Sequence, residues 1–381
     1  MNKKLASILG FIMIASMILA ACGGPAATTV APPPPTEKPA ATKAPTQPPA
    51  AAFKVGFVTD TGGISDSSFN ETQYNGVVAG CKEVGCEPKY IVSNEAADYE
   101  PNLTTFATEG YKLVQAAGFF LGDSLAKVAP QYPEVNWTIF DYGYEPCIPN
   151  VMGQTFKTDQ AAYLAGYLAA GMTKTGKIGT FGGAKIPTVT IFMVGLQKGM
   201  EAYNEKHGTD VKLVGWDNKT GEGLFTGDFQ DQVKGKESAQ SLFDEGADIF
   251  MPVGGQIGIP GFDVAKERGG LGIWVDTDGF ISLTTSPKDV ILTSVLKVMD
   301  VSAATVIKDV AEGKFKGCTN YVGDMPNGGV GLAPYHDLES KVPADLKKEI
   351  EDLKAKIISG ELKDTGCLSV PDWCPAGLYT P

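Results

Sequence analysis

Histidine is scarce in this chain of 381 residues, which holds only His207 and His336. Mechanisms that depend on clustered histidines are therefore disfavoured. The cysteines also lack the C-x2-C spacing of common zinc sites. The chain has no G-x-S-x-G elbow, no H-E-x-x-H and no G-x4-G-K-[ST] loop. We expect neither an enzyme nor a resident cofactor or metal.

Basic residues are also few, since 32 Lys and Arg stand against 44 Asp and Glu, for a net charge of −12. Nucleic-acid binding requires clustered Lys and Arg, so nucleic acid is excluded as the main partner. The hydrophobic fraction of 43% and the charged fraction of 20% are those of a globular protein.

Beyond the amino terminus, no uncharged apolar run reaches the 18 residues that would span a bilayer. The first segment is different: Lys3 and Lys4 precede an apolar run that ends in Leu19-Ala20-Ala21-Cys22-Gly23. This ending resembles the bacterial lipobox, in which the cysteine is lipidated after cleavage. We predict a lipoprotein signal peptide over 1–22 and lipid attachment at Cys22. The protein would be anchored on the extracytoplasmic face of the bacterial cell membrane. A plain signal peptide with a chance cysteine is the alternative.

Residues 23–52 contain nine Pro, nine Ala and five Thr. This composition cannot bury a core and predicts an extended linker, at most roughly 90 Å long at about 3.1 Å per residue. A body of 329 residues, 53–381, follows and is large enough for two domains.

Six cysteines remain in the body, an even number that suggests disulfides in an exported protein. Cys81 with Cys86, and Cys367 with Cys374, are close in sequence, which would leave Cys147 with Cys318. Six cysteines allow 15 pairings, and buried free thiols are the alternative.

Short apolar runs and amphipathic segments alternate along the body, which predicts parallel sheets covered by helices on both faces. About ten strands are too many for one compact sheet, so we expect two. A capping box, with Ser68 as N-cap and Glu71 three residues on, predicts the start of the first helix. Eight of the expected strands can be placed, at 54–60, 89–92, 119–121, 137–141, 177–181, 212–216, 249–253 and 272–276. The expected helices are 69–84, 103–116, 124–131, 158–172, 189–207, 231–245, 263–268, 289–312 and a charged helix within 335–364.

Ligands of open α/β sheets bind beyond the carboxyl ends of the strands. Acids, glycines and aromatic residues recur at these ends. They are Asp60, Phe69, Phe119, Phe120, Asp141, Gly182, Gly183, Gly254, Gly255, Asp276 and Asp278. Carboxylates accept hydrogen bonds from hydroxyls and amines, and glycine lets the backbone approach a ligand. The alternative is that such acids merely cap the next helix.

The segment Asp60-Thr-Gly-Gly-Ile-Ser-Asp66-Ser-Ser-Phe69-Asn70 resembles the opening motif of the basic membrane protein (BMP) family of substrate-binding lipoproteins. Further similar segments follow in the same order, over about residues 54–315. They are Gly182-Gly183-x-x-Ile186-Pro187, the run from Gly227 to Lys236, Val275-Asp276-x-Asp278 and Leu292–Lys297. The tail from Cys367 to Pro381 does not resemble the family core.

The resemblance implies a type I periplasmic-binding-protein fold, α/β with two Rossmann-like lobes that close on a ligand. The N-terminal lobe would comprise 53–157 and about 281–320. The C-terminal lobe would comprise 158–280 and part of 321–366, followed by a Cys-containing tail, 367–381. Members of the family capture purine nucleosides for an ABC importer, so an ABC permease and ATPase would be the partners of a monomer.

Carried over residue by residue, the resemblance implies a role for each site residue. Phe69 and Phe229 would sandwich the base, and Asn70 and Asp141 would read its polar edge. Asp276 and Lys297 would hold the ribose hydroxyls, Asp60 would support the base or its loop, and Gly254 would approach the ligand. Phe225 and Trp216 are rivals of Phe229, because the segment Asn218–Thr226 is an insertion. The usual partner after Asp278 is missing, since Gly279-Phe280 stands there.

Three other functions stay open at this stage. Aromatic rings and carboxylates would also suit a sugar or another small polar ligand. Asp276 with Asp278 could serve glycoside cleavage, although a pair on one strand end is more typical of a ligand clamp. A sensor that presents its closed form to a membrane receptor would have the same sequence pattern.

Overall fold

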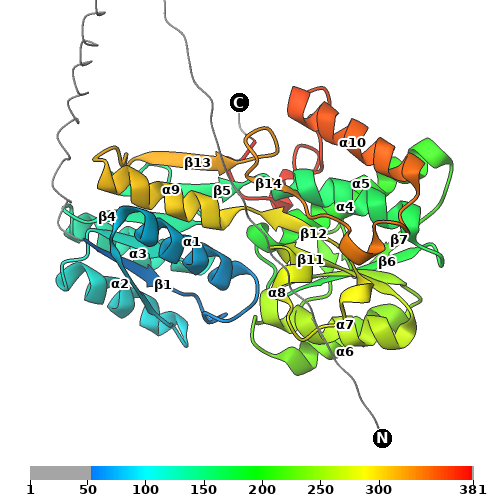
Figure 1. Ribbon diagram of the computed structural model, residues 1–381, viewed down its shortest axis with the longest axis horizontal. Coiled ribbons are helices and arrows are strands. Elements are labelled where there is room, and N and C mark those ends of the chain that lie inside the picture. The colour runs from blue at the N-terminus through cyan, green and yellow to red at the C-terminus, as the bar shows by residue number, and fades with distance from the viewer. Residues whose placement is uncertain (1–52, 380–381) are drawn as a thin grey trace, which may run out of the picture. The chain divides into compact units, whose positions relative to one another are not determined.

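A computed structural model describes residues 53–379. The expected signal peptide (1–22) with Cys22, the linker (23–52) and the last two residues of the tail lie outside the described residues. The body forms one compact unit. Within 53–379 it has two lobes, each built on a six-stranded sheet (Figure 1). The expected fold class, α/β with two Rossmann-like lobes, is confirmed.

The sheet of the first lobe is parallel throughout, in the order β13-β5-β4-β3-β1-β2. Its central strands are short apolar runs; β3 is buried at every position. Such runs form where helices cover both faces of a sheet. The strands are β1 (Lys54–Val58), β2 (Glu87–Ile91), β3 (Leu113–Ala116), β4 (Asn136–Phe140), β5 (Val151–Phe156) and β13 (Thr319–Gly323).

The sheet of the second lobe has the order β14-β12-β11-β10-β6-β7, with the edge strand β14 antiparallel to β12 and the other pairs parallel. A small hairpin, β8 (Trp216–Asp217) with β9 (Glu222–Gly223), stands apart from it. The strands are β6 (Lys177–Gly182), β7 (Lys212–Val214), β10 (Ile249–Val253), β11 (Leu271–Asp276), β12 (Ile291–Lys297) and β14 (Val330–Leu332).

Helices cover the sheets of both lobes (Figure 1). In the first lobe they are α1 (Phe69–Val84), α2 (Tyr99–Thr108), α3 (Gly122–Val128) and α9 (Met299–Ala311). In the second lobe they are α4 (Thr158–Met172), α5 (Pro187–His207), α6 (Gln232–Asp244), α7 (Ile259–Arg268), α8 (Gly279–Ser282) and α10 (Ala344–Ser359). Helices α4 and α5 pack very closely. There is no room for a side chain at Gly199 of α5, since a Cβ there would lie 1.8 Å from the carbonyl oxygen of Tyr163 on α4. The long helices of the second lobe are thus fixed to each other.

Within the described residues the chain passes between the two sheets three times. The passages are β5 to α4 at Lys157, β12 to α9 at Val298, and β13 to β14 over 324–329. The expected passage near residue 281 is wrong, because β12 pairs with β11 in the second sheet. The chain therefore returns to the first lobe only at α9, which packs on α1.

Two expected helices are partly strand. The expected helix 289–312 is β12 followed by α9, and the expected helix 103–116 is α2 ending at Thr108 followed by β3. The expected strand at Phe119–Leu121 is a turn of 3-10 helix. Both misread strands are buried at nearly every position. A strand with two buried faces has no alternation, so its sequence resembles a buried helix. The sequence prediction also missed β5, β13 and β14.

The described body contains three disulfides, which are Cys81–Cys86, Cys147–Cys318 and Cys367–Cys374. The pairing expected from proximity in the sequence is confirmed. Cys81–Cys86 lies at the carboxyl end of α1, and Cys147–Cys318 joins the loop after β4 to the start of β13. Cys367–Cys374 closes a loop in the tail.

Candidate functional site

A cavity lies where the carboxyl ends of the two sheets face each other. It encloses about 570 Å³, including its open mouth. Side chains from both lobes line it. They are Asp60, Gly62, Asp66, Phe69, Asn70, Phe119, Phe120 and Asp141 from the first lobe, and Ile186, Thr188, Val189, Phe192, Phe229, Val253, Gly254, Gly255, Asp276 and Lys297 from the second. All eight residues expected at the site are among them.

The loop between β1 and α1 is organised by a carboxylate that the sequence prediction did not select. Asp66 accepts hydrogen bonds from the backbone N–H groups of Ser68 (3.0 Å), Asn70 (2.8 Å) and Glu71 (3.1 Å). It therefore caps the amino end of α1. The expected capping box at Ser68 is wrong, because the Ser68 hydroxyl makes no bond within its own helix. A carboxylate three residues before the helix was the signal that could have identified this cap.

Asn70 joins the two acids of this loop. Its side-chain amide donates to Asp60 Oδ1 (2.8 Å) and to Asp66 Oδ2 (3.1 Å), and its Oδ1 accepts from the backbone N–H of Asp60 (3.3 Å). Burial raises the pKa of Asp60 and raises that of Asp66 to about 6. Two carboxylates are thus held in fixed positions in a poorly solvated site, where an added donor would be strongly bound.

Asp141 and Lys297 form a buried ion pair across the cleft. Lys297 Nζ lies 2.5 Å from Asp141 Oδ2, and the side chains are 2% and 7% exposed. Burial raises the pKa of Asp141, and the Lys297 ammonium counteracts part of this increase. The ammonium also lies 5.0 Å from the ring centroid of Phe69, close enough for a cation–π contact. One cation therefore links an acid and an aromatic ring of the opposite lobe.

Asp276 ends β11 and accepts a hydrogen bond from the Ser68 hydroxyl of the other lobe at 2.6 Å. Burial raises its pKa to about 6, although Lys297 and the Ser68 bond lower it. Asp276 and Asp141 both have positive φ, 70° and 59°, which is uncommon for residues other than glycine. The same backbone conformation turns one acid from each sheet into the cavity, and strain of this kind concentrates at functional sites.

Two of the rings that line the cavity, Phe69 and Phe229, each pack against a glycine. A Cβ at Gly118 would lie 2.8 Å from the Phe69 ring, and one at Gly183 would lie 2.4 Å from the Phe229 ring. Phe229 also contacts Phe120 of the first lobe, with ring centroids 6.1 Å apart. These two positions explain why glycine is required near each ring.

The two rivals of Phe229 point elsewhere. Phe225 packs on Trp216 at a centroid distance of 6.2 Å and lies against Gly182. Neither residue is among those that line the cavity. Of Trp216, Phe225 and Phe229, it is therefore Phe229 whose ring lines the cavity.

Further hydrogen bonds cross between the lobes beside the cavity. Trp274 Nε1 donates to the carbonyl oxygen of Ser67 (3.2 Å), and Gln256 Nε2 donates to that of Gly62 (3.0 Å). Gln230 donates to the carbonyl oxygen of Thr61. The bound carbonyls belong to the loop that carries the acids. The lobes are thus in contact around the site.

Asp278 has a different role from Asp276. Its Oδ1 caps the short helix α8 by accepting from Phe280 N (3.0 Å), and its Oδ2 lies 2.7 Å from His336 Nε2. His336 in turn stacks on Phe280, with centroids 4.2 Å apart. Asp278 is not among the lining residues, so Asp276 and Asp278 do not face the cavity as a pair.

The sequence prediction missed the wall formed by the first turns of α5, namely Ile186, Thr188, Val189 and Phe192. The Gly182-Gly183 pair at the end of β6 marked this edge of the sheet. The helix that follows, however, cannot be distinguished in sequence from a core helix. Within 53–379 no group of three or more His, Cys, Asp or Glu side chains is placed so that it could hold a metal ion. No helix there has the length and apolarity needed to cross a bilayer.

Comparison with known proteins places the chain in a family. Residues 53–365 match the family described as "ABC transporter substrate-binding protein PnrA-like". The chain is similar to a "CD4+ T-cell-stimulating antigen" of Listeria monocytogenes, 29% identical over 95% of this chain and 98% of the relative. It is also similar to an "ABC transporter nucleoside-binding protein BmpA" of Lactococcus lactis, 30% identical over 81% of this chain and 88% of the relative.

Among solved structures, an ABC transporter solute-binding protein from Aeropyrum pernix K1 has a TM-score of 0.74 and 29% identity, and covers 81% of this chain and 92% of its own. The two-lobed fold, the cleft at the strand ends and the match over 313 of 381 residues agree. The chain belongs to the BMP family of ABC transporter substrate-binding proteins.

Proposed function

We propose that the cavity captures a purine nucleoside between the two lobes. The observation that carries the proposal is that Phe69 of one lobe and Phe229 of the other line one cavity together with four carboxylates and a single ammonium group. A purine has a flat π face and a polar edge, and stacking on aromatic rings contributes about 1–3 kcal/mol per base. The name of the Lactococcus lactis relative supports the same ligand class.

The polar groups suit the edges of such a ligand. Asn70 and Asp141 would read the base edge, and Asp276 and Lys297 would hold the ribose hydroxyls. Asp276 already accepts a hydroxyl hydrogen bond, from Ser68 at 2.6 Å, so its carboxylate is oriented for this kind of donor. Asp60 would act through Asn70, which it orients by a bond of 2.8 Å. Gly254 would let the backbone approach the ligand.

The charge balance favours a nucleoside over a nucleotide. Asp60, Asp66, Asp141 and Asp276 face the cavity with Lys297 as the cation among its lining residues. An additional phosphate would be repelled by the surplus of carboxylates. A neutral ligand with several N–H and O–H donors would instead satisfy acceptors that are buried.

Capture would proceed by hinge closure about the three passages between the sheets. In the closed form Ser68, Trp274 and Gln256 join the lobes around the ligand. We further propose that Cys22 carries the lipid anchor and that the closed protein, as a monomer, delivers its ligand to an ABC permease and ATPase. Binding and release without bond cleavage would make the protein a carrier rather than an enzyme.

The decisive experiment identifies the ligand directly. The folded protein would be purified, denatured, and the released molecules analysed by mass spectrometry. The protein refolded without ligand would then be titrated calorimetrically with adenosine, guanosine, inosine, ribose and galactose. We expect a purine nucleoside in the first measurement and heat from nucleosides in the second. Heat from the sugars alone would replace the nucleoside by a sugar, and a released free nucleobase would indicate an enzyme.

A further inference from the structure

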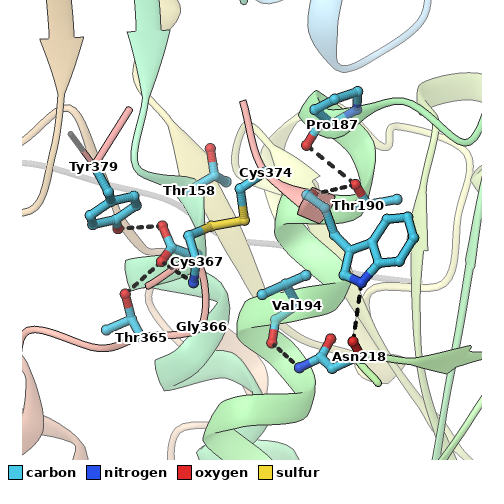
Figure 2. Close-up of a disulfide and its surroundings, with 12 residues drawn as sticks. Thr158, Pro187, Thr190, Val194, Asn218, Thr365, Gly366, Cys367, Cys374 and Tyr379 are labelled. Atoms are coloured by element: carbon cyan, nitrogen blue, oxygen red, sulfur yellow. Dashed lines mark hydrogen bonds between the residues drawn. A yellow bond between two sulfur atoms is a disulfide. The ribbon is translucent and has the colours of Figure 1, made fainter. Parts of the chain in front are cut away.

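The tail beyond residue 365 lies outside the part of the chain that matches the family, yet it is well packed. Cys367, Cys374 and Leu378 are 1%, 5% and 6% exposed. The Cys367–Cys374 disulfide closes a loop of the tail against α4 and α5 (Figure 2). At Gly366 the backbone touches α5 directly, because a Cβ there would lie 2.6 Å from Val194 Cγ1. The tail is therefore part of the second lobe's surface rather than a free end.

One end of this loop is fixed to a buried carboxylate on α4. Asp159 is fully buried, and its Oδ2 accepts from the Thr365 hydroxyl (2.7 Å) and from Cys367 N (3.4 Å). Its Oδ1 accepts from the Tyr379 hydroxyl at 2.6 Å (Figure 2). Both ends of the tail thus converge on one side chain. The Tyr379 ring also lies 4.8 Å from the ammonium of Lys157, the residue at which the chain first passes between the lobes.

The middle of the loop is fixed to α5. The Thr190 hydroxyl donates to the carbonyl oxygen of Trp373 at 2.5 Å. Thr190 is on the same first turns of α5 that line the cavity with Thr188, Val189 and Phe192. This part of α5 therefore stands between the cavity on one side and Trp373 on the other.

The Trp373 side chain is also fixed to the segment that leads to Phe229. Its Nε1 donates to the carbonyl oxygen of Asn218 at 3.1 Å (Figure 2), and its ring meets that of Trp216 edge to face at 6.0 Å. Asn218 side-chain Nδ2 bonds back to the carbonyl oxygen of Val194 on α5 (3.2 Å). Trp373 thus supports the helix and the β8–β9 segment together.

We propose that the disulfide-closed tail, residues 365–379, is a brace that positions the wall of the ligand cavity formed by the first turns of α5 and by the segment 216–229. Trp373 and Thr190 are its positioning residues, and Asp159 is its anchor. All of the brace beyond Thr365 lies outside the part of the chain that matches the family. It makes the affinity for the ligand depend on a segment that does not touch the ligand. This consequence rests on the proposed function, whereas the brace itself does not.

The test compares two disulfide-free variants. Cys367→Ser with Cys374→Ser opens the tail, and Cys81→Ser with Cys86→Ser opens the disulfide at the end of α1 in the other lobe, as a matched control. Hydrogen exchange is measured without ligand at a temperature at which both variants are folded. We expect faster exchange in 187–197 and 216–229 for the tail variant alone. Unchanged exchange there, in a tail variant whose own residues 365–379 exchange faster, would overturn the brace.

The second measurement is the affinity for inosine. We expect a loss of about 3- to 30-fold for the tail variant, the usual range for residues that act on a site from a distance, and no loss for the control. Thr190→Val keeps the shape of the side chain and removes the hydroxyl that donates to Trp373. That hydroxyl also lies 3.2 Å from the carbonyl oxygen of Ile186 four residues earlier. We expect this variant to show the same two changes as the tail variant, faster hydrogen exchange in 187–197 and 216–229 and weaker binding of inosine, but smaller in size. Because it keeps the disulfide, it still tests the brace if the tail variant does not fold.

The outcomes separate the two proposals. If the native protein binds no nucleoside, the proposed function fails, and the exchange measurement still decides the brace. If exchange in 187–197 rises but the inosine affinity of the tail variant stays at the native value, the tail is a local stabiliser without influence on the ligand, and the inference is wrong.

Discussion

Replacing Asp276 by Asn should weaken ligand binding and stabilise the folded protein at the same time. Asp276 is 7% exposed, and its pKa is about 6 in the folded protein against an ordinary value of 3.8. Its carboxylate is therefore ionised at pH 7 at a cost in free energy. Asn keeps the shape and an oxygen that can accept from Ser68, but it removes the charge.

The magnitude follows from the two pKa values. The difference between about 6 and 3.8 corresponds to about 3 kcal/mol at pH 7. Because the folded pKa is the higher one, this cost is absent below pH 3.8, develops between pH 3.8 and about 6, and is complete above it. At pH 7 the Asn variant should thus gain up to about 3 kcal/mol in free energy of unfolding from the closed form, in which Asp276 is buried, and less to the extent that the lobes open without ligand. For binding, loss of the charged acceptor should cost about 2–4 kcal/mol.

The assay is urea unfolding of the protein without ligand between pH 4 and pH 8, together with calorimetric titration with inosine at pH 7. Asp278→Asn is the matched control, since Asp278 lies two residues away but caps α8 and contacts His336 instead of lining the cavity. The control should gain no stability and keep the native affinity. An Asp276→Asn variant that is less stable at pH 7 and binds as the native protein would refute both the burial of the charge and the role of the residue.

Three further variants test other parts of the site. Phe69→Ala should weaken purine nucleosides by about 1–3 kcal/mol and leave the weaker binding of ribose unchanged; equal losses in calorimetry would make Phe69 a packing residue. Lys297→Met leaves Asp141 buried without its partner, so it should lower the free energy of unfolding by about 3–5 kcal/mol at pH 7, measured in urea. An unchanged midpoint would mean that the pair does not persist in solution. Cys22→Ser should release the protein from membranes into the soluble fraction, and retention in the pellet would argue against lipidation.

The positions of the site residues could be predicted from the sequence because the fold brings them together in a simple way. Asp60, Asp141, Gly254 and Asp276 follow or end parallel strands, and parallel strands end at the same edge. Phe69 and Asn70 begin the helix after the first such strand. The strand ends therefore predict that Asp60 lies near Asp141 at the edge of one sheet and Gly254 near Asp276 at the edge of the other.

The partners of these residues could not be predicted in the same way. Ser68 and Asp66 are both good N-cap residues, and the sequence prediction chose Ser68. The Ser68 hydroxyl is instead bound to Asp276, 208 residues away in the other lobe. This choice depends on closure of the cleft, which no local pattern contains. The wall on α5 was missed for a related reason, because its tight packing on α4 makes the whole helix appear as core.

Two of the four acids in the cavity are bound by side chains of the opposite lobe. Closure of the lobes therefore decides whether these two carboxylates are buried. Asp141 is bound by Lys297 and Asp276 by Ser68, whereas Asp60 and Asp66 are bound within their own loop. Opening the lobes would return Asp141 and Asp276 to water. At pH 7 closure therefore buries charge at a cost, since the pKa of Asp276 rises to about 6. A ligand can stabilise the closed form only by as much as it binds that form better. We expect this preference to come from N–H and O–H donors placed on these two acids, which selects nucleosides over equally flat ligands without donors.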